Sequence, residues 1–497
     1  MRESRKAVIS PISLSACGPG GKPAYLGSMK RSQPPRHPLG KQMGKSHRAA
    51  GTPARPFEKR PDRKPARAAR KLPANTPPVE LTVTALGVRG DGLAEAGGKR
   101  YFVPLTVPGD RLLVRPVEET GDGVRAEILE MLEPGADRRE PPCPSFGRCG
   151  GCTLQHLTDT AYRAYKQALL LDAVAREGID PELIAELVTV PPHSRRRAIL
   201  VARKLAQGTV LGFHEHRGHF IVDIEECTVL APALMAVLPP LRALLDRLLP
   251  AAGNARATML SLDGSVDLLL DLPEMPDLTG REALAGFAAE ANLARLSITI
   301  EGGTPELLAE RRAATLSFAG IPVAVPPGAF LQATPEAEAA LLEAVLAGVG
   351  EAKNIADLYA GCGTFSLPLA AKGAAVHAVE GHAPALEALA AASRKAGPSV
   401  KLSVEKRDLA GDPLAEDELD RFDAVVFDPP RTGARSQAAA LAKSQVPVVV
   451  AVSCNPATFA RDMRLLLEGG YRLERITPVD QFLWSAHLEL VAVFRRA

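Results

Sequence analysis

The stretch Asp357-Leu-Tyr-Ala-Gly-Cys-Gly-Thr-Phe365 decides the fold class of this chain. It follows an apolar segment at residues 354–358 and precedes a segment of helical periodicity, which indicates a strand–turn–helix unit. Its glycines allow the backbone to turn sharply and to approach a ligand closely. Glu380 ends the next predicted strand, 23 residues after Asp357, where its carboxylate can accept hydrogen bonds from two ribose hydroxyls. Together the loop and Glu380 predict a nucleotide site.

Strand and helix signals alternate on both sides of this loop. Helices are expected at 336–346 and from residues 365 and 383, with strands at 354–358, 375–379, 424–427, 448–452, 471–478 and 487–494. This alternation is typical of a doubly wound, Rossmann-like α/β sheet, which we place at residues 331–497. The loop has one fewer phosphate-cradling glycine than the dinucleotide fingerprint, and the ligand it implies is S-adenosylmethionine (SAM).

The 497 residues are enough for about three domains. Short alternating segments between Val79 and Ile128, separated by Gly- and Pro-rich turns, predict a small OB-like β-barrel at residues 76–136. Mixed helix and strand signals predict an α/β central domain at residues 137–330. Residues 1–75 contain 18 Lys or Arg, three acids and 11 Pro without apolar periodicity, so we expect a disordered basic arm.

The formal charge of +3 hides an uneven distribution, because the arm carries +15 and the remainder −12. An RNA tether, a solvated extension or a translation start at Met29 or Met43 would each fit such an arm. The longest charge-free stretch, 313–335, contains four prolines, so we expect no membrane helix. Seven cysteines, three of them crowded together, are unlike a disulfide framework and indicate a cytoplasmic protein.

Two motifs at the ends of later strands carry chemistry. Asp428-Pro-Pro-Arg431 has Arg where enzymes that methylate amino nitrogens have an aromatic residue, which argues against a nitrogen acceptor. Cys454, in Ser-Cys-Asn-Pro, ends the next strand at the same edge of the sheet. C5 of uracil becomes nucleophilic when a thiolate adds at C6, and a carboxylate must then remove the C5 proton. Cys454 is the predicted nucleophile and Glu489 the predicted base.

Four further cysteines form a candidate metal site. Cys143, Cys149 and Cys152 are spaced x5 and x2, and Cys227 follows 75 residues later. Four soft thiolates suit either zinc or an iron–sulfur cluster, and their spacing does not decide between the two.

Taken together, these motifs resemble the RNA 5-methyluridine methyltransferases, and most of all the bacterial 23S rRNA branch with a TRAM domain and a [4Fe-4S] cluster (RumA/RlmD type). The resemblance extends from Val79 to Arg495. Its carriers are Cys143-Pro-Ser-Phe-Gly-Arg-Cys-Gly-Gly-Cys152, Leu211-Gly-Phe-His, Ile221-Val-Asp-Ile-Glu-Glu-Cys227, Phe330-Leu-Gln332, the loop at 357–363, Asp428-Pro-Pro-Arg431, Ser453-Cys-Asn-Pro456 and His487-Leu-Glu489.

The resemblance implies Cys454 as nucleophile, Glu489 as base, a TRAM barrel, and a [4Fe-4S] cluster on Cys143, Cys149, Cys152 and Cys227. It implies cofactor contacts from Gln332, Tyr359, Thr364, Glu380, Asp408 and Asp428. Thr364 and Asp408 stand where the family usually has Asn, and residues 481–487 lack its Pro-His-Thr.

The expected function is therefore SAM-dependent C5-methylation of a uridine in 23S rRNA by a cytoplasmic, monomeric enzyme. The same chemistry on tRNA is one alternative, and a non-catalytic RNA-binding or assembly factor is another. Trp484 is expected either to stack on a base or to belong to the core. Phosphate contacts are expected from Arg195, Arg196, Arg197, Arg203, Lys204 and Arg217.

Overall fold

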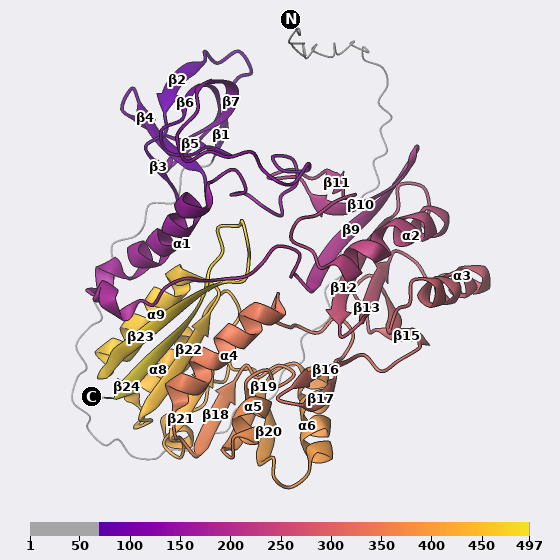
Figure 1. Ribbon diagram of the computed structural model, residues 1–497, viewed down its shortest axis with the longest axis vertical. Coiled ribbons are helices and arrows are strands. Elements are labelled where there is room, and N and C mark those ends of the chain that lie inside the picture. Colours follow the sequence, from indigo (N-terminus) through magenta and orange to yellow (C-terminus); the bar gives the residue numbers. More distant parts are fainter. Residues whose placement is uncertain (1–68, 497) are drawn as a thin grey trace, which may run out of the picture. The chain divides into compact units, whose positions relative to one another are not determined.

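The computed structural model describes residues 69–496 (Figure 1). Most of the predicted arm, residues 1–68, lies outside the described residues. Strand β1 (Arg70–Lys71), which falls within the predicted arm, pairs with residues 118–119 of the first sheet. Among the described residues, no helix is both long and apolar enough to cross a membrane.

The first sheet is built from short strands whose alternate side chains face a small core of their own. Segment 79–86 pairs with β6 through its first half and with β4 through its second half, which closes the sheet on itself. Its assignment as an OB-like TRAM barrel stays a prediction. The strands are β1, β2 (Val79–Thr82), β3 (Ala85–Leu86), β4 (Gly92–Ala96), β5 (Lys99–Val103), β6 (Arg111–Thr120) and β7 (Gly123–Glu133).

The second sheet has the order β11-β10-β9-β12-β13-β14-β15, and two helices share its hydrophobic core. Strand β9 alternates, burying Ala198 and Leu200 while Arg197 and Ile199 lie on the other face. The elements are β9 (Arg197–Leu205), β10 (Gly208–His214), β11 (Ile221–Asp223), α2 (Pro232–Leu248), β12 (Asn254–Leu262), β13 (Ser265–Leu272), α3 (Leu278–Glu290), β14 (Arg295–Ile300) and β15 (Glu306–Glu310).

The third sheet is the doubly wound sheet predicted from the sequence, in the order β20-β19-β18-β21-β22-β24-β23-β8. It comprises β8 (Val188–Thr189), β18 (Asn354–Leu358), β19 (Ala375–Glu380), β20 (Leu402–Lys406), β21 (Ala424–Phe427), β22 (Val448–Ser453), β23 (Tyr471–Asp480) and β24 (Glu489–Arg496). β18 to β22 are parallel, and β24 pairs antiparallel with both β22 and β23.

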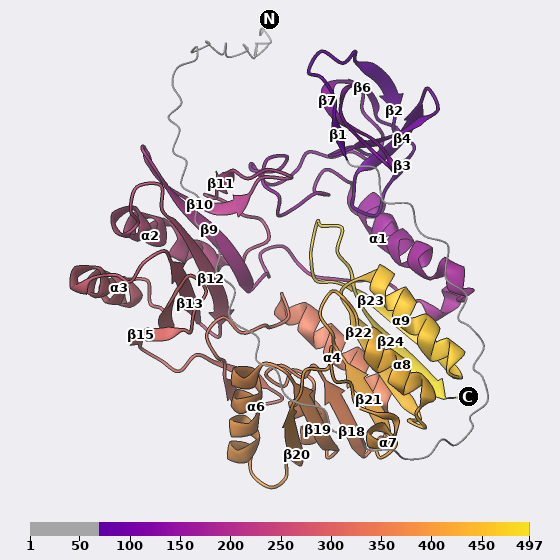
Figure 2. The same cartoon turned by 180° about the vertical axis from the view of Figure 1, so that it is seen from behind.

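Helices cover both faces of this sheet (Figure 2). One face packs against α1, α8 and α9, and the other against α4, α5 and α6. The helices are α1 (Asp159–Val174), α4 (Pro335–Val349), α5 (Ser366–Ala371), α6 (Ala383–Ala396), α7 (Glu416–Leu419), α8 (Arg435–Lys443) and α9 (Pro456–Glu468). A hairpin of β16 (Thr315–Phe318) and β17 (Ile321–Ala324) packs beside α6. Short 3-10 helices lie at Ala175–Glu177 and Pro181–Leu183.

The chain order reverses around β18, which has β19 on one side and β21 on the other. Such a switch point leaves a crevice at the carboxyl ends of the strands, where open α/β sheets bind ligands. The loops after β18, β21 and β22 all open at this edge. They carry the glycine loop, Asp428 and Cys454, so the fold brings three predicted site segments together.

Candidate active site

One cavity of about 1200 Å³ brings together the predicted nucleophile, the predicted base and the four candidate metal ligands, whereas none of the six predicted cofactor contacts lines it. Its wall includes Cys454 and Glu489 from the third sheet, and Arg197 and Ile199 from the face of β9 that the second core leaves free. Phe330, from the segment before α4, is 61% exposed and also lines the cavity. Cys143, Cys149, Cys152 and Cys227 are on the same wall.

The glycine loop is held by carboxylates beneath it. Glu380 accepts hydrogen bonds from the backbone N–H of Gly361 at 3.0 Å and of His382 at 2.7 Å, which fixes its carboxylate beside the loop. Asp357 is fully buried and accepts from the Ser366 hydroxyl. A Cβ at Gly361 would meet nothing within 4 Å, so the loop faces open space there. Tyr359 is half-buried in a left-handed conformation next to this loop.

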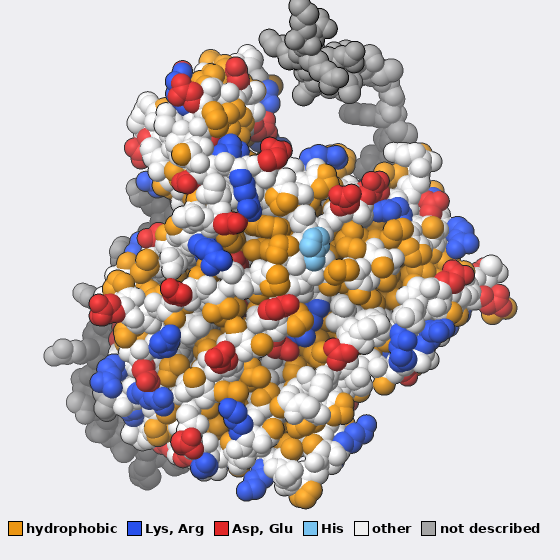
Figure 3. Space-filling view, viewed as in Figure 1, with side chains coloured by type: hydrophobic (Ala, Val, Ile, Leu, Met, Phe, Trp, Pro, Cys, Tyr) orange, Lys and Arg blue, Asp and Glu red, His pale blue; other side chains and the backbone are white. Residues whose placement is uncertain are grey.

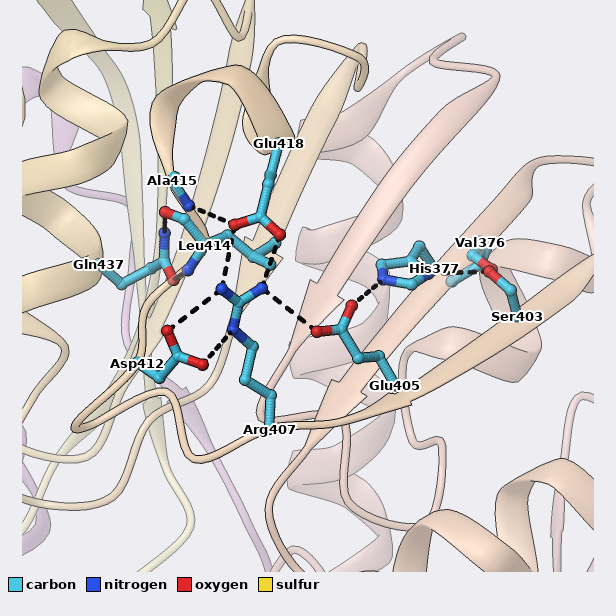
Figure 4. Close-up of polar contacts among 10 residues, drawn as sticks. All are labelled: Val376, His377, Ser403, Glu405, Arg407, Asp412, Leu414, Ala415, Glu418 and Gln437. Carbon is cyan, nitrogen blue, oxygen red and sulfur yellow. Dashed lines mark hydrogen bonds and ion pairs between the residues drawn. The ribbon is translucent and has the colours of Figure 1, made fainter.

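Asp408 follows β20, which is separated from the loop-bearing strand β18 by β19. Burial, followed by the negative charges of Asp462, Asp408 and Glu380, raises the pKa of Tyr359 to about 12. The Arg407 guanidinium bonds to Glu418, Asp412 and Glu405, and Glu405 accepts from His377 on β19 (Figure 4). This network fixes the segment that carries Asp408, whose own side chain is exposed.

A hydrogen-bonded chain links the two carboxylates next to the cavity. Gln332 donates from Nε2 to Asp428 Oδ2 at 2.8 Å, and its Oε1 accepts from Gln481 Nε2 at 3.0 Å. Gln481 Nε2 also donates to Glu489 Oε1 at 2.6 Å. Gln332, Gln481 and Glu489 are buried. Gln481 was not among the predicted site residues, because one Gln in a loop gives no sequence signal of its own.

Burial weakens the acidity of both carboxyls. Burial first, and then the negative charge of Asp428, raises the pKa of Glu489 to about 8, against the opposing Gln481 hydrogen bond. Burial also raises the pKa of Asp428 to about 7, although the hydrogen bond from Gln332 lowers it. A carboxyl of this kind exchanges a proton near neutral pH, as a general base must.

Cys454 lies between β22 and α9, at the point where the chain turns from strand to helix. The Asn455 side chain caps α9 by accepting from the Ala457 N–H, and the positive end of the helix favours a thiolate nearby. Burial, followed by the charges of Glu489 and Asp428, raises the pKa of Cys454 to about 12, whereas Arg431 opposes them. Charge on the two carboxyls therefore controls how readily the thiol ionises.

A buried ion pair holds the loop that precedes Glu489. Lys166 of α1 is fully buried and pairs with Asp480 at 2.7 Å, and its ammonium group also donates to the His487 carbonyl. The Tyr162 hydroxyl donates to Asp480 and accepts from the Trp484 N–H. Trp484 is 7% exposed and belongs to a hydrophobic cluster with Tyr162, so it is a core residue and does not stack on a base.

The four cysteines are neighbours in space despite their separation in sequence. Burial raises the pKa of Cys152 to about 12 against an opposing hydrogen bond with Gln155, and the charges of Cys227, Cys149 and Cys143 contribute to the rise. Within residues 69–496, no group of three or more His, Cys, Asp or Glu side chains could hold a metal ion. The cluster and its ligands stay a prediction.

Comparisons with known proteins agree with this geometry. A family model described as tRNA (uracil-5-)-methyltransferase matches residues 323–497. An RNA methyltransferase of Brucella suis biovar 1 (strain 1330), itself described as uncharacterized, is 44% identical over 417 residues, covering 84% of this chain and 98% of the relative. The 23S rRNA (uracil(1939)-C(5))-methyltransferase RlmD of Shewanella amazonensis is 34% identical over 431 residues, covering 84% and 95%. The chain belongs to the RNA uracil-C5 methyltransferase family.

A solved structure shares the fold of this family member. The tRNA (uracil-54, C5)-methyltransferase of Pyrococcus abyssi, in complex with S-adenosyl-L-homocysteine, superimposes with a TM-score of 0.67. It is 22% identical and covers 84% of this chain and all of that chain, which establishes the fold. The predicted family resemblance, methyltransferase fold and enzyme class are thus confirmed.

The basic residues predicted to contact RNA have different surroundings in this methyltransferase. Arg196 is 5% exposed, pairs with Glu338 and donates to the Gln332 carbonyl, so the prediction of a phosphate contact is wrong for this residue. Lys204 and Arg217 are paired with Asp246 and Asp91, and Arg203 is exposed on β9. Arg195 and Arg197 instead line the cavity, each over an aromatic ring, that of Phe482 or Phe330.

Charge is not segregated over the face seen in Figure 3, where acidic and basic side chains alternate. Arg195 and Arg197 form no ion pair with the residues that the structure describes, and burial lowers the pKa of both. Desolvated guanidinium groups without a carboxylate partner favour an anionic ligand. The cavity therefore offers better phosphate contacts than a general surface patch would.

Proposed function

We propose that this methyltransferase transfers a methyl group from SAM to C5 of a uridine in 23S rRNA. The observation that carries the proposal is the placement of the Cys454 thiol and the Glu489 carboxyl on one cavity at the switch-point edge of the sheet. Cys454 and Glu489 are assigned as nucleophile and base. The enzyme is expected to act as a monomer in the cytoplasm.

The proposed chemistry follows from these two groups. The Cys454 thiolate adds to C6 of the uracil, and the electron pair displaced from the C5–C6 double bond makes C5 nucleophilic. SAM supplies the methyl group that C5 accepts. Glu489 then removes the C5 proton, the C5–C6 double bond re-forms, and the thiolate leaves C6.

SAM fits the edge around the glycine loop. Glu380 suits the ribose hydroxyls, and Tyr359 and Thr364 stand on the loop itself, which faces open space at Gly361. Asp408 follows β20, two strands away from the strand that carries the loop. Gln332 and Asp428 lie between this loop and the catalytic base Glu489, so they would contact the methyl-bearing end of the cofactor.

We propose that the barrel and the four cysteines help to position the RNA substrate. We assign residues 76–136 to a TRAM domain, residues 137–330 to a central domain and residues 331–497 to the methyltransferase domain. Cys143, Cys149, Cys152 and Cys227 supply four soft thiolates on one wall, and this ligand type supports the proposal of a [4Fe-4S] cluster, although these side chains form no metal-holding group as the described residues stand. A zinc ion is the alternative to the cluster, and it would require all four sulfur atoms to lie about 2.3 Å from the metal. Iron content and visible absorbance after anaerobic purification, in wild type and Cys227→Ala, test the cluster.

The substrate choice is tested separately. The 23S rRNA assignment is supported by the relative from Shewanella amazonensis, whose similarity covers 84% of this chain and 95% of that relative. Total RNA from cells lacking the gene is incubated with protein and methyl-labelled SAM, and labelled nucleosides are identified in separated RNAs. We expect 5-methyluridine in the large rRNA and none with Cys454→Ala. Label in tRNA would replace the substrate assignment, and product from Cys454→Ala would overturn the mechanism.

A further inference from the structure

Gln481 occupies a central position that the proposed chemistry does not yet use. It is 2% exposed, lies in the loop between β23 and β24, and contacts both Gln332 and Glu489. Its third partner is a backbone group, the N–H of Ala333, which donates to Gln481 Oε1 at 2.8 Å. Three hydrogen bonds therefore hold one buried amide.

The backbone contact fixes the direction of every bond in this chain. An N–H can only donate, so the Gln481 atom that faces Ala333 must be its oxygen, and its nitrogen must face Gln332 and Glu489. Gln332 then has to present its own oxygen to Gln481, which turns its nitrogen toward Asp428. Each amide in the chain consequently donates toward a carboxyl group.

The two carboxylate oxygens of Glu489 differ in their hydrogen-bond partners. Oε1 accepts from Gln481 at 2.6 Å, whereas Oε2 is buried and has no hydrogen-bond partner among residues 69–496. Glu489 also lines the cavity that holds Cys454. Burying a carboxylate oxygen without a hydrogen-bond partner costs free energy, unless a ligand or a bound proton supplies the missing contact.

We propose that Gln481 is the positioning residue for the base: it holds Oε1 of Glu489 and leaves Oε2 as the atom that takes the uracil C5 proton. This inference rests on the proposed function. The C5–H electron pair re-forms the C5–C6 double bond, the C6–S bond breaks toward the Cys454 sulfur, and the proton ends on Oε2. The donated hydrogen bond stabilises Glu489 as an anion before the transfer.

Other charges around Glu489 must be considered for any pH effect. Asp428 at the end of β21 and the Cys454 thiol at the end of β22 oppose its ionisation, and Arg431 favours it. On β23, Asp480 is already neutralised by Lys166. His487, in the same loop, bonds through Nδ1 to Arg431. Removing the Gln481 donor removes the one hydrogen bond that favours the anion at Oε1.

The test compares Gln481→Met with a matched control, Gln437→Met. Gln437 is an equally buried amide, bonded through both of its ends to the Leu414 backbone and remote from the cavity (Figure 4). We expect Gln481→Met to slow turnover by about 10- to 100-fold, the range for losing a hydrogen bond to a charged group. A covalent RNA adduct should accumulate, and the acidic limb of the pH–rate profile should move to higher pH.

The Gln437→Met control should be less stable in urea than the wild type, but it should neither accumulate the covalent adduct nor shift the pH–rate profile. If Gln481→Met loses stability as the control does, but keeps the wild-type adduct level and pH profile, Gln481 is merely structural and the inference is overturned. If wild type forms no adduct and Cys454→Ala still methylates RNA, the proposed function fails instead. The two failures are therefore distinguishable.

Discussion

Replacing Glu489 by Gln should make the protein more stable at alkaline pH than the wild type. Burial and Asp428 raise the pKa of Glu489 to about 8 from its ordinary 4.5. A group with a raised folded pKa contributes its full stability below pH 4.5 and loses it as the pH rises through 8. At about 1.36 kcal/mol per pH unit the loss reaches about 5 kcal/mol at most. Part of the raised pKa of Glu489 comes from its repulsion by Asp428. We therefore expect Glu489→Gln to gain only about 2 kcal/mol in the free energy of unfolding at pH 9.

Urea unfolding followed by far-UV circular dichroism from pH 5 to pH 9 measures this difference. The free energies of Glu489→Gln and wild type should converge near pH 5 and separate as the pH rises. Glu474→Gln, at an exposed ion pair on β23, serves as a charge-matched control without a pH-dependent gain. Parallel stability curves for Glu489→Gln and wild type across the whole range would refute the account of its buried carboxyl.

Three further outcomes follow from other contacts. Lys166→Met should lower the free energy of unfolding by about 3–5 kcal/mol by leaving Asp480 buried and unpaired, and adding Asp480→Asn should restore part of it in urea titrations. Arg197→Ala should weaken RNA binding and reduce the slope of log affinity against log salt by about 1, as measured by filter binding. Gly363→Ala should raise the Kd for SAM in calorimetry, since its Cβ would lie 2.4 Å from Leu389 Cδ1 and the residue has φ +97°.

The sequence predicted the third sheet well because its strands are short apolar runs bounded by strong turn signals. The predicted strands at 354–358 and 424–427 coincide with β18 and β21. β20 was missed, since Leu402-Ser-Val-Glu-Lys406 is an edge strand with few buried side chains. β12 gives a weaker sequence signal because Asn, Arg and Thr interrupt its apolar pattern on the exposed face.

Sequence prediction placed Asp428 and Cys454 correctly, directly after β21 and β22, because a motif marks each of these strand ends. It failed for contacts made across long sequence separations. Arg196 resembled its neighbours in a basic run, yet its pairing with Glu338 is set by tertiary packing 142 residues away. Lys166, in the middle of α1, gave no sign of its partner Asp480, 314 residues later.

Helix α1 has a practical consequence for anyone who wishes to isolate the catalytic module. A truncated protein beginning at residue 331 would keep the glycine loop and Cys454 but discard α1 and the short strand β8, which borders β23. Asp480 would lose its counter-ion and the loop before Glu489 its tether. The smallest self-sufficient catalyst is accordingly discontinuous along the chain, and a working minimal version must graft residues 159–190 back onto it.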